Sequence, residues 1–305
     1  MLDGKSLVRS LREQLNEGAD AEWLNDRTSY EYLYDAAVEL VKRTNCLTAE
    51  QSITTTDDGS SYTLNADFLK LYLKDSNNNF FVKLYDGTSY NFILWKEYEQ
   101  IVYDNNTTVQ NIPDSFTIVD DGTLDAQITG TANQEGDATG GECTLTDTSS
   151  ATKFADVSAG DAIHNTTDKS FGIVLSKTSD TSLKIALFDG DSNEVSYGDD
   201  YVIQPQGRSK LVFEPGTDTA GYTVTVYYVQ RPAPVFSEYG IYRIPAYYKD
   251  MLVEYAAFKY KYRDREPGFG DTFFKYWDRR IRMASNDMNS KFARGGFTVS
   301  FKKRR

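Results

Sequence analysis

Hydrophobic residues repeat with the period of an α-helix only near the two ends of this 305-residue chain, and this arrangement limits its fold most. Leucines stand four residues apart in residues 5–16, which predicts a short amphipathic helix. A second helix is expected from Ser29, its predicted N-cap, to about Lys42. Its apolar face is wide and aromatic, so it needs a large apolar partner from another part of the chain.

Two more helices are expected near the other end. Pro245 suits the start of one helix, and Pro267-Gly268 ends it. The apolar side of a final helix over about residues 269–289 consists of Phe273, Trp277, Ile281, Ala284 and Met288. The chain then closes with GGFTVSFKKRR, which predicts a hinge, one short strand and a basic tip. A strand without a neighbour in its own chain is a candidate for pairing with the sheet edge of another chain.

Between the helical ends the apolar period changes to two, as is typical of strands. Residues 53–103 alternate in this way around a hairpin turn at Asp86-Gly87, and residues 207–230 resume the pattern. We expect these two stretches to form one sheet. Short strands and turns over about residues 115–206 predict a compact β module inserted between them, because insertion at a surface turn costs little loop entropy.

The predicted fold class is therefore α+β, with N-terminal and C-terminal helices around a β-sheet core and an inserted small β-barrel-like module. Residues 104–170 are rich in Asp, Thr, Gly, Ser and Asn, so most of them are expected to form loops or short edge strands. The expected division is 1–114 for the N-terminal helices and first core strands, 115–206 for the inserted module, 207–290 for the last core strands and the C-terminal helical hairpin, and 291–305 for an extended basic arm.

Charge is divided unevenly along the chain. Residues 242–305 hold 16 Lys and Arg against 7 Asp and Glu, about +9, although the whole chain carries −12. Residues 1–241 therefore carry about −21. An acidic body joined to a basic, aromatic helical end suits a subunit that docks onto copies of itself or onto an acidic partner. Tight DNA binding is not expected, since an acidic surface repels phosphates.

Catalytic, cofactor-binding and membrane signals are missing from the sequence. The one histidine, His164, has no recognisable nucleophile beside it and is expected to be a solvated turn residue. No stretch approaches the roughly 20 apolar residues that cross a bilayer, and the charged start does not resemble a signal peptide. Cys46 and Cys143 fit no metal-ligand spacing and are expected to be reduced thiols. These features predict a protein made in the cytoplasm, without a cofactor.

One segment imitates a calcium loop. The candidate metal ligands are Asp189, Asp191, Asn193 and Asp200. Glu194 occupies the position where such a loop needs its sharp-turn glycine, so a solvated β-turn is favoured over a metal site.

Three segments share an order with a known architecture: YDAAVELVKRTNCLT followed by SYTLNADFLKLYL, then YTVTVYYVQRPAP, then IPAYYKDMLVEYAAFKYKYRDREPGFGDTFFKYWDRRI. This order resembles the adaptor, or head-to-tail connector, proteins of tailed bacteriophages, especially the short-tailed type. The segment from Phe154 to Ile203 looks like a small β module of several phage structural proteins. The likeness covers about two thirds of the chain by pattern, and Asn65 stands where the family often has a proline.

The resemblance implies a ring, commonly of twelve copies, that binds beneath the portal at the head-tail junction of the virion. The ring continues the DNA channel, through which double-stranded DNA passes without specific binding, and offers a platform to downstream tail or nozzle proteins and tail fibres. No catalytic residue comes with this family. The expected contacts with the portal or with neighbouring copies are Tyr255, Phe258, Arg279, Arg280 and Arg282 on the late helices, and Phe297, Val299, Phe301, Lys302, Lys303, Arg304 and Arg305 on the tail.

Two alternatives remain open from the sequence. One is another phage tail or fibre-attachment ring component. The other is a cell-wall-degrading enzyme that uses the acidic pairs Asp57-Asp58 or Asp199-Asp200, although adjacent carboxylates on a turn are poorly placed for glycoside hydrolysis.

Overall fold

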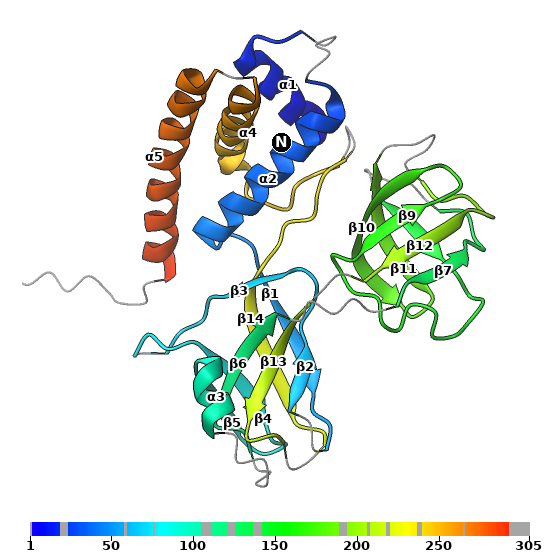
Figure 1. The fold of residues 1–305 in the computed structure, drawn as a ribbon, viewed down its shortest axis with the longest axis vertical. Helices are drawn as coiled ribbons and strands as arrows, with labels where there is room; N and C mark the ends of the chain where they lie inside the picture. Colours follow the sequence, from blue (N-terminus) through cyan, green and yellow to red (C-terminus); the bar gives the residue numbers. More distant parts are fainter. Residues whose placement is uncertain are drawn as a thin grey trace, which may run out of the picture.

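The protein consists of a helical part, an eight-stranded sheet and a six-stranded sheet, which lie around a common junction (Figure 1). The α+β class predicted from the sequence, with helices from both chain ends and a barrel-like module, is confirmed. The computed structural model describes residues 2–18, 24–57, 60–75, 77–104, 112–120, 126–136, 142–188, 194–205, 208–217, 220–236, 240–264 and 266–292.

The helical part joins the two ends of the chain. Its elements are α1 (Gly4–Leu15), α2 (Asp26–Thr44), the 3-10 turn η1 (Ala246–Tyr248), α4 (Lys249–Arg263) and α5 (Pro267–Phe292). One core of leucine, alanine, tyrosine and tryptophan side chains fills the space between them. The N-cap of α2 is Asn25 and not Ser29 as predicted, because the Asn25 side chain accepts a hydrogen bond from the backbone N–H of Thr28 at 2.8 Å. The predicted apolar side of the last helix is confirmed for Trp277, Ile281 and Ala284, which are buried.

The eight-stranded sheet unites strands from distant parts of the chain, as the sequence predicts. Its strands are β1 (Thr48–Thr54), β2 (Ser61–Thr63), β3 (Phe68–Leu71), β4 (Phe81–Tyr85), β5 (Tyr90–Trp95), β6 (Ser115–Asp120), β13 (Ser209–Glu214) and β14 (Thr223–Gln230), and the short helix α3 (Tyr98–Asp104) follows β5. The order is β1-β14-β4-β5-β6-β13-β2, and β3 also pairs with β14. Gln51 of β1 bonds the backbone of Thr63 and Asn65 at 3.1 and 2.9 Å, so the two ends of the sheet approach each other and enclose an apolar core.

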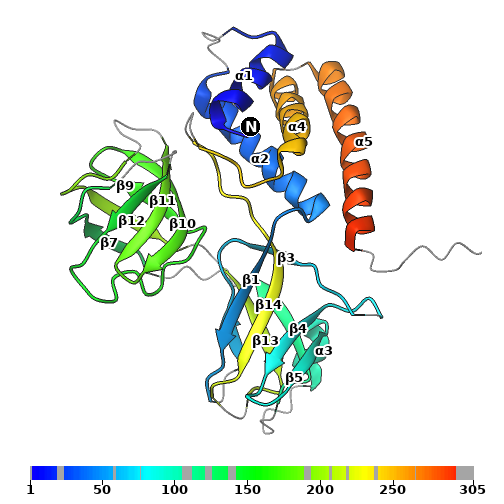
Figure 2. The ribbon, with the colours of Figure 1, turned by 180° about the vertical axis from the view of Figure 1, so that it is seen from behind.

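The six-stranded sheet is a separate antiparallel module with its own core around Phe154, Ile163 and Tyr201. Its strands are β7 (Ile128–Thr131), β8 (Cys143–Thr146), β9 (Ala162–Asn165), β10 (Ser170–Ser179), β11 (Ser182–Phe188) and β12 (Asp200–Gln204), in the order β7-β12-β9-β10-β11-β8. The sheet is strongly curled, and this barrel-like shape is visible from both sides (Figures 1 and 2).

One boundary differs from the sequence-based expectation. Residue 115 was expected to begin the inserted module, but β6 pairs along its length with β13 of the larger sheet. The polar stretch 104–170, expected to be mostly loop or short edge strand, holds four short strands, β6 to β9, of which β7 and β8 are the two edges of the six-stranded sheet. It also supplies buried residues such as Phe116 and Leu145. Isolated apolar residues between Thr, Gly and Asp are enough to build these short strands, because only every second side chain of a strand faces the core. None of the described helices has both the length and the apolar character needed to span a bilayer.

Candidate assembly interface

The aromatic residues expected at an interface lie within the helical hairpin. The ring of Tyr255 on α4 packs against Trp277 of α5 with a centroid distance of 4.7 Å. Phe258 packs against Phe274 at 5.0 Å. Both expected residues are half-buried, so much of their surface serves the packing of α4 on α5. Their contact with another subunit stays a prediction.

The three predicted arginines on α5 differ from one another. Arg280 lies 2.9 Å from Asp250 and 3.4 Å from the buried Glu254 on α4, so it joins the two helices. Arg282 pairs with Asp278 of its own helix at 2.7 Å. Arg279 is exposed and forms no ion pair within the described part of the chain. Of the three, Arg279 is the one whose charge is available to a partner.

The predicted tail contacts, Phe297, Val299, Phe301, Lys302, Lys303, Arg304 and Arg305, lie outside the described residues.

The outer face of α5 carries a row of large apolar side chains, here called the α5 stripe: Phe269, Tyr276 and Met283. Their exposed fractions are 65%, 59% and 59%. They stand seven residues apart, and a spacing of seven turns an α-helix by only about 20° from a full number of turns, so all three project from one side. Lys275 and Arg279 are exposed beside this row. The α5 stripe is thus an apolar strip with a basic border.

A second exposed apolar surface lies on β5 and the start of α3. We call it the β5 band: Tyr90, Phe92 and Leu94 on the outer face of β5, with the exposed Trp95 at the strand end and Tyr98 on α3. Tyr90 and Phe92 are 67% and 60% exposed, whereas Ile93 between Phe92 and Leu94 points into the sheet's core and is fully buried.

Neighbouring rings on β4 support this surface. Tyr85 lies 4.8 Å from Tyr90, and Phe81 lies 5.2 Å from Phe92, between ring centroids. The aromatic side chains are therefore held on a rigid sheet. Grouped exposed apolar residues of this kind mark interaction sites more often than single ones do.

The sequence does contain a signal for the β5 band that pattern reading missed. The strand YNFILW has apolar residues on both faces, whereas a strand with one solvated face alternates apolar and polar residues. A strand that is apolar on both faces indicates a second partner. Glu97 and Glu99 follow it, are exposed, and form no ion pair among the residues that the structure describes, so the end of the band toward α3 is acidic. Lys83 of β4 stands opposite Phe92 and lies over the Tyr227 ring at 5.2 Å.

The residues considered for catalysis or metal binding do not form a site. Asp199 accepts hydrogen bonds from Asn165 at 2.9 Å and from the backbone of Ser196 at 2.8 Å, while Asp200 accepts one from Thr131 at 2.6 Å. The two carboxylates thus have separate structural partners. Within the described residues no three His, Cys, Asp or Glu side chains form a group suited to a metal ion.

The remaining candidates are placed as follows. Asp57 is exposed, and His164 is an exposed residue of β9 beside Phe171 and not a turn residue as expected. The other members of the calcium-like and acidic pairs, Asp58, Asp189, Asp191 and Asn193, lie outside the described residues.

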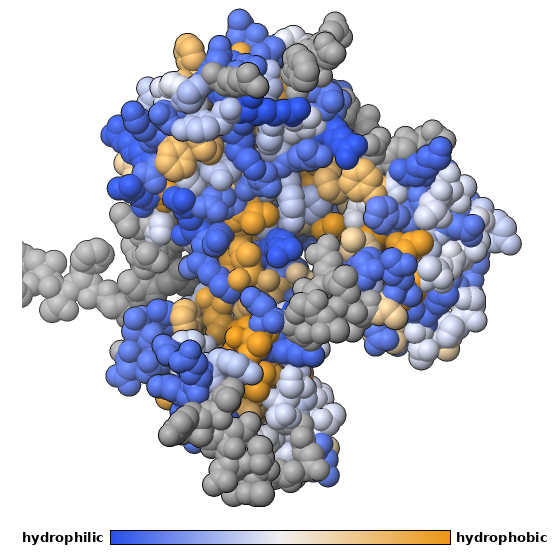
Figure 3. All heavy atoms as spheres, in the orientation of Figure 1, coloured by the Kyte–Doolittle hydropathy of each residue, from blue (hydrophilic) through white to orange (hydrophobic). Residues whose placement is uncertain are grey.

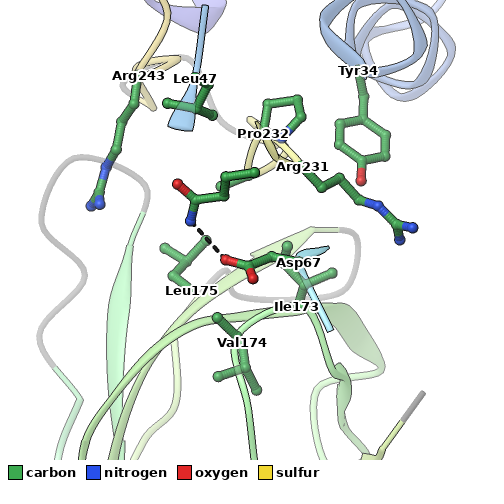
Figure 4. A pocket seen from close by; sticks show the side chains of 13 residues that line it. Tyr34, Leu47, Asp67, Ile173, Val174, Leu175, Arg231, Pro232 and Arg243 are labelled. Carbon is green, nitrogen blue, oxygen red and sulfur yellow. Dashed lines mark hydrogen bonds between the residues drawn. The ribbon is translucent and has the colours of Figure 1, made fainter. Parts of the chain in front are cut away.

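The three parts of the protein meet around a cavity of about 300 Å³ (Figure 4). Tyr34 from α2, Asp67, Ile173 from β10 and Arg231 after β14 contribute to its wall. Apolar surface gathers in this region, between the helical part and the eight-stranded sheet (Figure 3). Gly160 of the module closes the approach: its φ is +97°, and a Cβ atom there would lie 3.1 Å from the backbone carbon of Ala66. The residues around the cavity therefore form the junction between the three parts of the protein.

The pH dependence of folding stability tests the role of the buried Asp67 carboxyl group at this junction. Its carboxylate accepts hydrogen bonds from Tyr228 at 2.9 Å and from Gln230 at 2.7 Å. Burial raises the pKa of Asp67, although these bonds and the charge of Arg231 oppose the rise. The folded state therefore holds this proton more tightly than the unfolded state does, and stability falls as pH rises from about 4 through the folded-state pKa.

We expect Asp67→Asn, which cannot ionise, to lose this pH dependence. The free energy of unfolding of the wild type should fall relative to that of Asp67→Asn as the pH rises above about 4, as measured by urea unfolding at several pH values. A difference between the two proteins that stays constant with pH would contradict the argument.

Comparison with known proteins found neither a family model nor a curated protein that matches this chain. Its function is therefore argued from its own surfaces: an apolar sheet face with one acidic end, an apolar, base-bordered helix face, and a junction that holds the parts together.

Proposed function

We propose that this protein is a structural subunit of a virion, which forms a head-to-tail adaptor ring in a tailed bacteriophage. In this role it binds beneath the portal, continues the DNA channel and provides the attachment platform for the tail. The observation that carries the proposal is the β5 band. Tyr90, Phe92 and Leu94 lie on the face of β5 opposite the core residue Ile93, and Tyr90 and Phe92 are mostly exposed, so these two rings contribute little to the chain's own core.

The distribution of charge supports an assembling role. The basic end of the chain and its acidic remainder divide the charge of each copy unevenly along the sequence, which favours contact between unlike parts of identical subunits. The organisation agrees with the resemblance to connector proteins: helices from both ends share one core, and the strand in YTVTVYYVQRPAP lies inside the large sheet. The helical end and the terminal segment 293–305 are the proposed grips for the portal or a neighbouring copy.

The mass of the purified full-length protein, alone and after mixing with a portal ring, tests this function. A ring-sized complex with the portal is the expected result. A protein that forms rings alone and ignores the portal would point to a tail or fibre-attachment component. A protein that stays monomeric in both conditions, or that releases products from cell-wall material, would overturn the proposal.

One substitution connects the β5 band to this assembly. We expect Phe92→Ser to weaken self-association or portal binding by about tenfold or more, because the contact loses a buried aromatic ring worth about 1.5–3 kcal/mol. Sedimentation over a range of concentrations measures the change. Tyr197→Ser is the matched control, since Tyr197 is 72% exposed but lies on the six-stranded module. Equal effects of the two substitutions would mean that the β5 band is not part of the contact.

A further inference from the structure

The α5 stripe is slightly longer than the strand that carries the β5 band. Phe269 and Met283 are fourteen residues apart on a helix, which spans about 21 Å at 1.5 Å per residue. Tyr90 and Trp95 are five residues apart on β5, which spans about 17 Å at 3.3 Å per residue. A helix laid on this strand would therefore cover the band from one end to the other, with aromatic side chains on both sides of the contact.

The α5 stripe has a basic border, and the end of the β5 band toward α3 is acidic, although Lys83 stands opposite Phe92 in the middle of the band. Lys275 and Arg279 lie beside the α5 stripe, and Glu97 and Glu99 lie beside the β5 band. Among the residues that the structure describes, none of these four forms an ion pair, although Arg280 and Arg282 on the same helix do. Unpaired charges of opposite sign beside two apolar surfaces orient the surfaces as they approach and exclude contacts between like surfaces.

Both surfaces are accessible. α5 packs on α4 through the opposite side of the helix, where Trp277 and Ile281 are buried. In Figures 1 and 2, α5 and the β5–α3 region lie on the side of the molecule away from the six-stranded module, so the module does not obstruct either surface. α5 is held in the helical part, and β5 in the large sheet, so one chain cannot bring its own stripe onto its own band.

We infer that the α5 stripe of one copy packs on the β5 band of a second copy. The inference rests on the proposed assembly function and names the two surfaces through which the subunits meet. The occupant of the band is a second copy because the same chain carries the surface that fits the band in length, apolar character and charge.

Disulfide trapping tests this contact in the full-length protein. Phe92→Cys and Tyr276→Cys place single thiols at the centres of the band and the stripe. Both positions are largely exposed, so both variants should fold. Cys46 and Cys143 are half-buried and buried, and the wild type controls for their reactivity. We expect a cross-linked dimer from a mixture of the two variants and much less product from either variant alone.

The possible outcomes separate the inference from the proposed function. The variant that carries both substitutions should give a ladder of cross-linked species if the contact repeats around a ring. A ladder that stops at the dimer supports the contact but contradicts the ring. Cross-linking of Phe92→Cys with itself alone, or no cross-linking in a protein that assembles by mass, overturns the contact and leaves the ring. No cross-linking and no assembly overturns both.

Charge reversal provides an independent measurement. Arg279→Glu should weaken the association of copies several-fold, and Glu99→Lys in the same chain should restore a large part of the loss. Lys184→Glu on the six-stranded module makes the same change in net charge away from both surfaces, so it is the matched control. An equal loss in Arg279→Glu and Lys184→Glu, or no recovery in the combined variant, would overturn the inference.

Discussion

Trp277→Ala is expected to destabilise the helical part by about 3–5 kcal/mol, the usual cost of emptying the site of a buried aromatic side chain. Trp277 is fully buried, and its ring lies 4.7 Å from Tyr255 and 5.6 Å from Phe274. Arg43 of α2 lies over the same ring at 4.7 Å, so this side chain joins three helices. Hydrogen exchange of the backbone amides of α4 and α5 measures the loss, together with urea unfolding of the whole chain.

Two neighbouring substitutions act as controls. Trp277→Phe keeps most of the apolar volume and removes an indole N–H that is buried without a hydrogen-bond partner, so it should cost much less than the alanine variant. Tyr276→Ala changes the adjacent, exposed residue and should leave stability nearly unchanged while it weakens association. If Tyr276→Ala destabilised the hairpin as much as Trp277→Ala does, the separation between the packing face and the α5 stripe would be wrong.

The four long helices could be predicted from the sequence because each has an apolar face with helical period, although the N-cap of α2 was misplaced by four residues. Pro267-Gly268 separates α4 from α5, and Trp277, Ile281 and Ala284 repeat on the buried side. The sheet that joins residues 53–103 with 207–230 was also predictable from matching alternation. The membership of β6 in this sheet was not, since Ser115–Asp120 stands beside Asp- and Thr-rich segments and is identified as part of the sheet only by its pairing with β13.

The candidate interface was harder to predict, because local patterns do not reveal which partner a side chain will find. Arg280 looked available for another subunit, but the fold brings Asp250 and Glu254 of α4 beside it. The sequence separation between these residues hides the ion pairs. Phe92, in contrast, could have been identified from its strand, because Ile93 beside it is apolar as well. A strand that is apolar on both faces is expected to be buried on both faces. Within one copy of the chain, only the face that carries Ile93 is buried.

Asp161→Ala is expected to cost about 3–5 kcal/mol, because it leaves a buried guanidinium without its counter-charge. The Asp161 side chain is fully buried, and that of Arg208 is only 10% exposed, with 2.7 Å between them. Asp161 precedes β9 of the module, whereas Arg208 precedes β13 of the large sheet. The pair therefore stands where the chain leaves the inserted module. Urea unfolding and protease sensitivity near Arg208 measure the loss.

An exposed ion pair in the same module is the control for Asp161→Ala. Lys177 and Asp180 lie 3.1 Å apart with side chains 33% and 48% exposed, so Asp180→Ala should cost less than about 1 kcal/mol. Replacing both buried partners, as in Asp161→Leu with Arg208→Met, should recover much of the loss, since no unpaired charge remains. A double variant as unstable as Asp161→Ala would mean that Asp161 acts mainly through its bond to the backbone of Ser158, at 2.8 Å, and not through Arg208. Comparing the single and double variants thus separates the role of Asp161 in the turn before β9 from its role in the ion pair with Arg208, which links the module to the large sheet. This ion pair must hold if the module is to keep one orientation in an assembled ring.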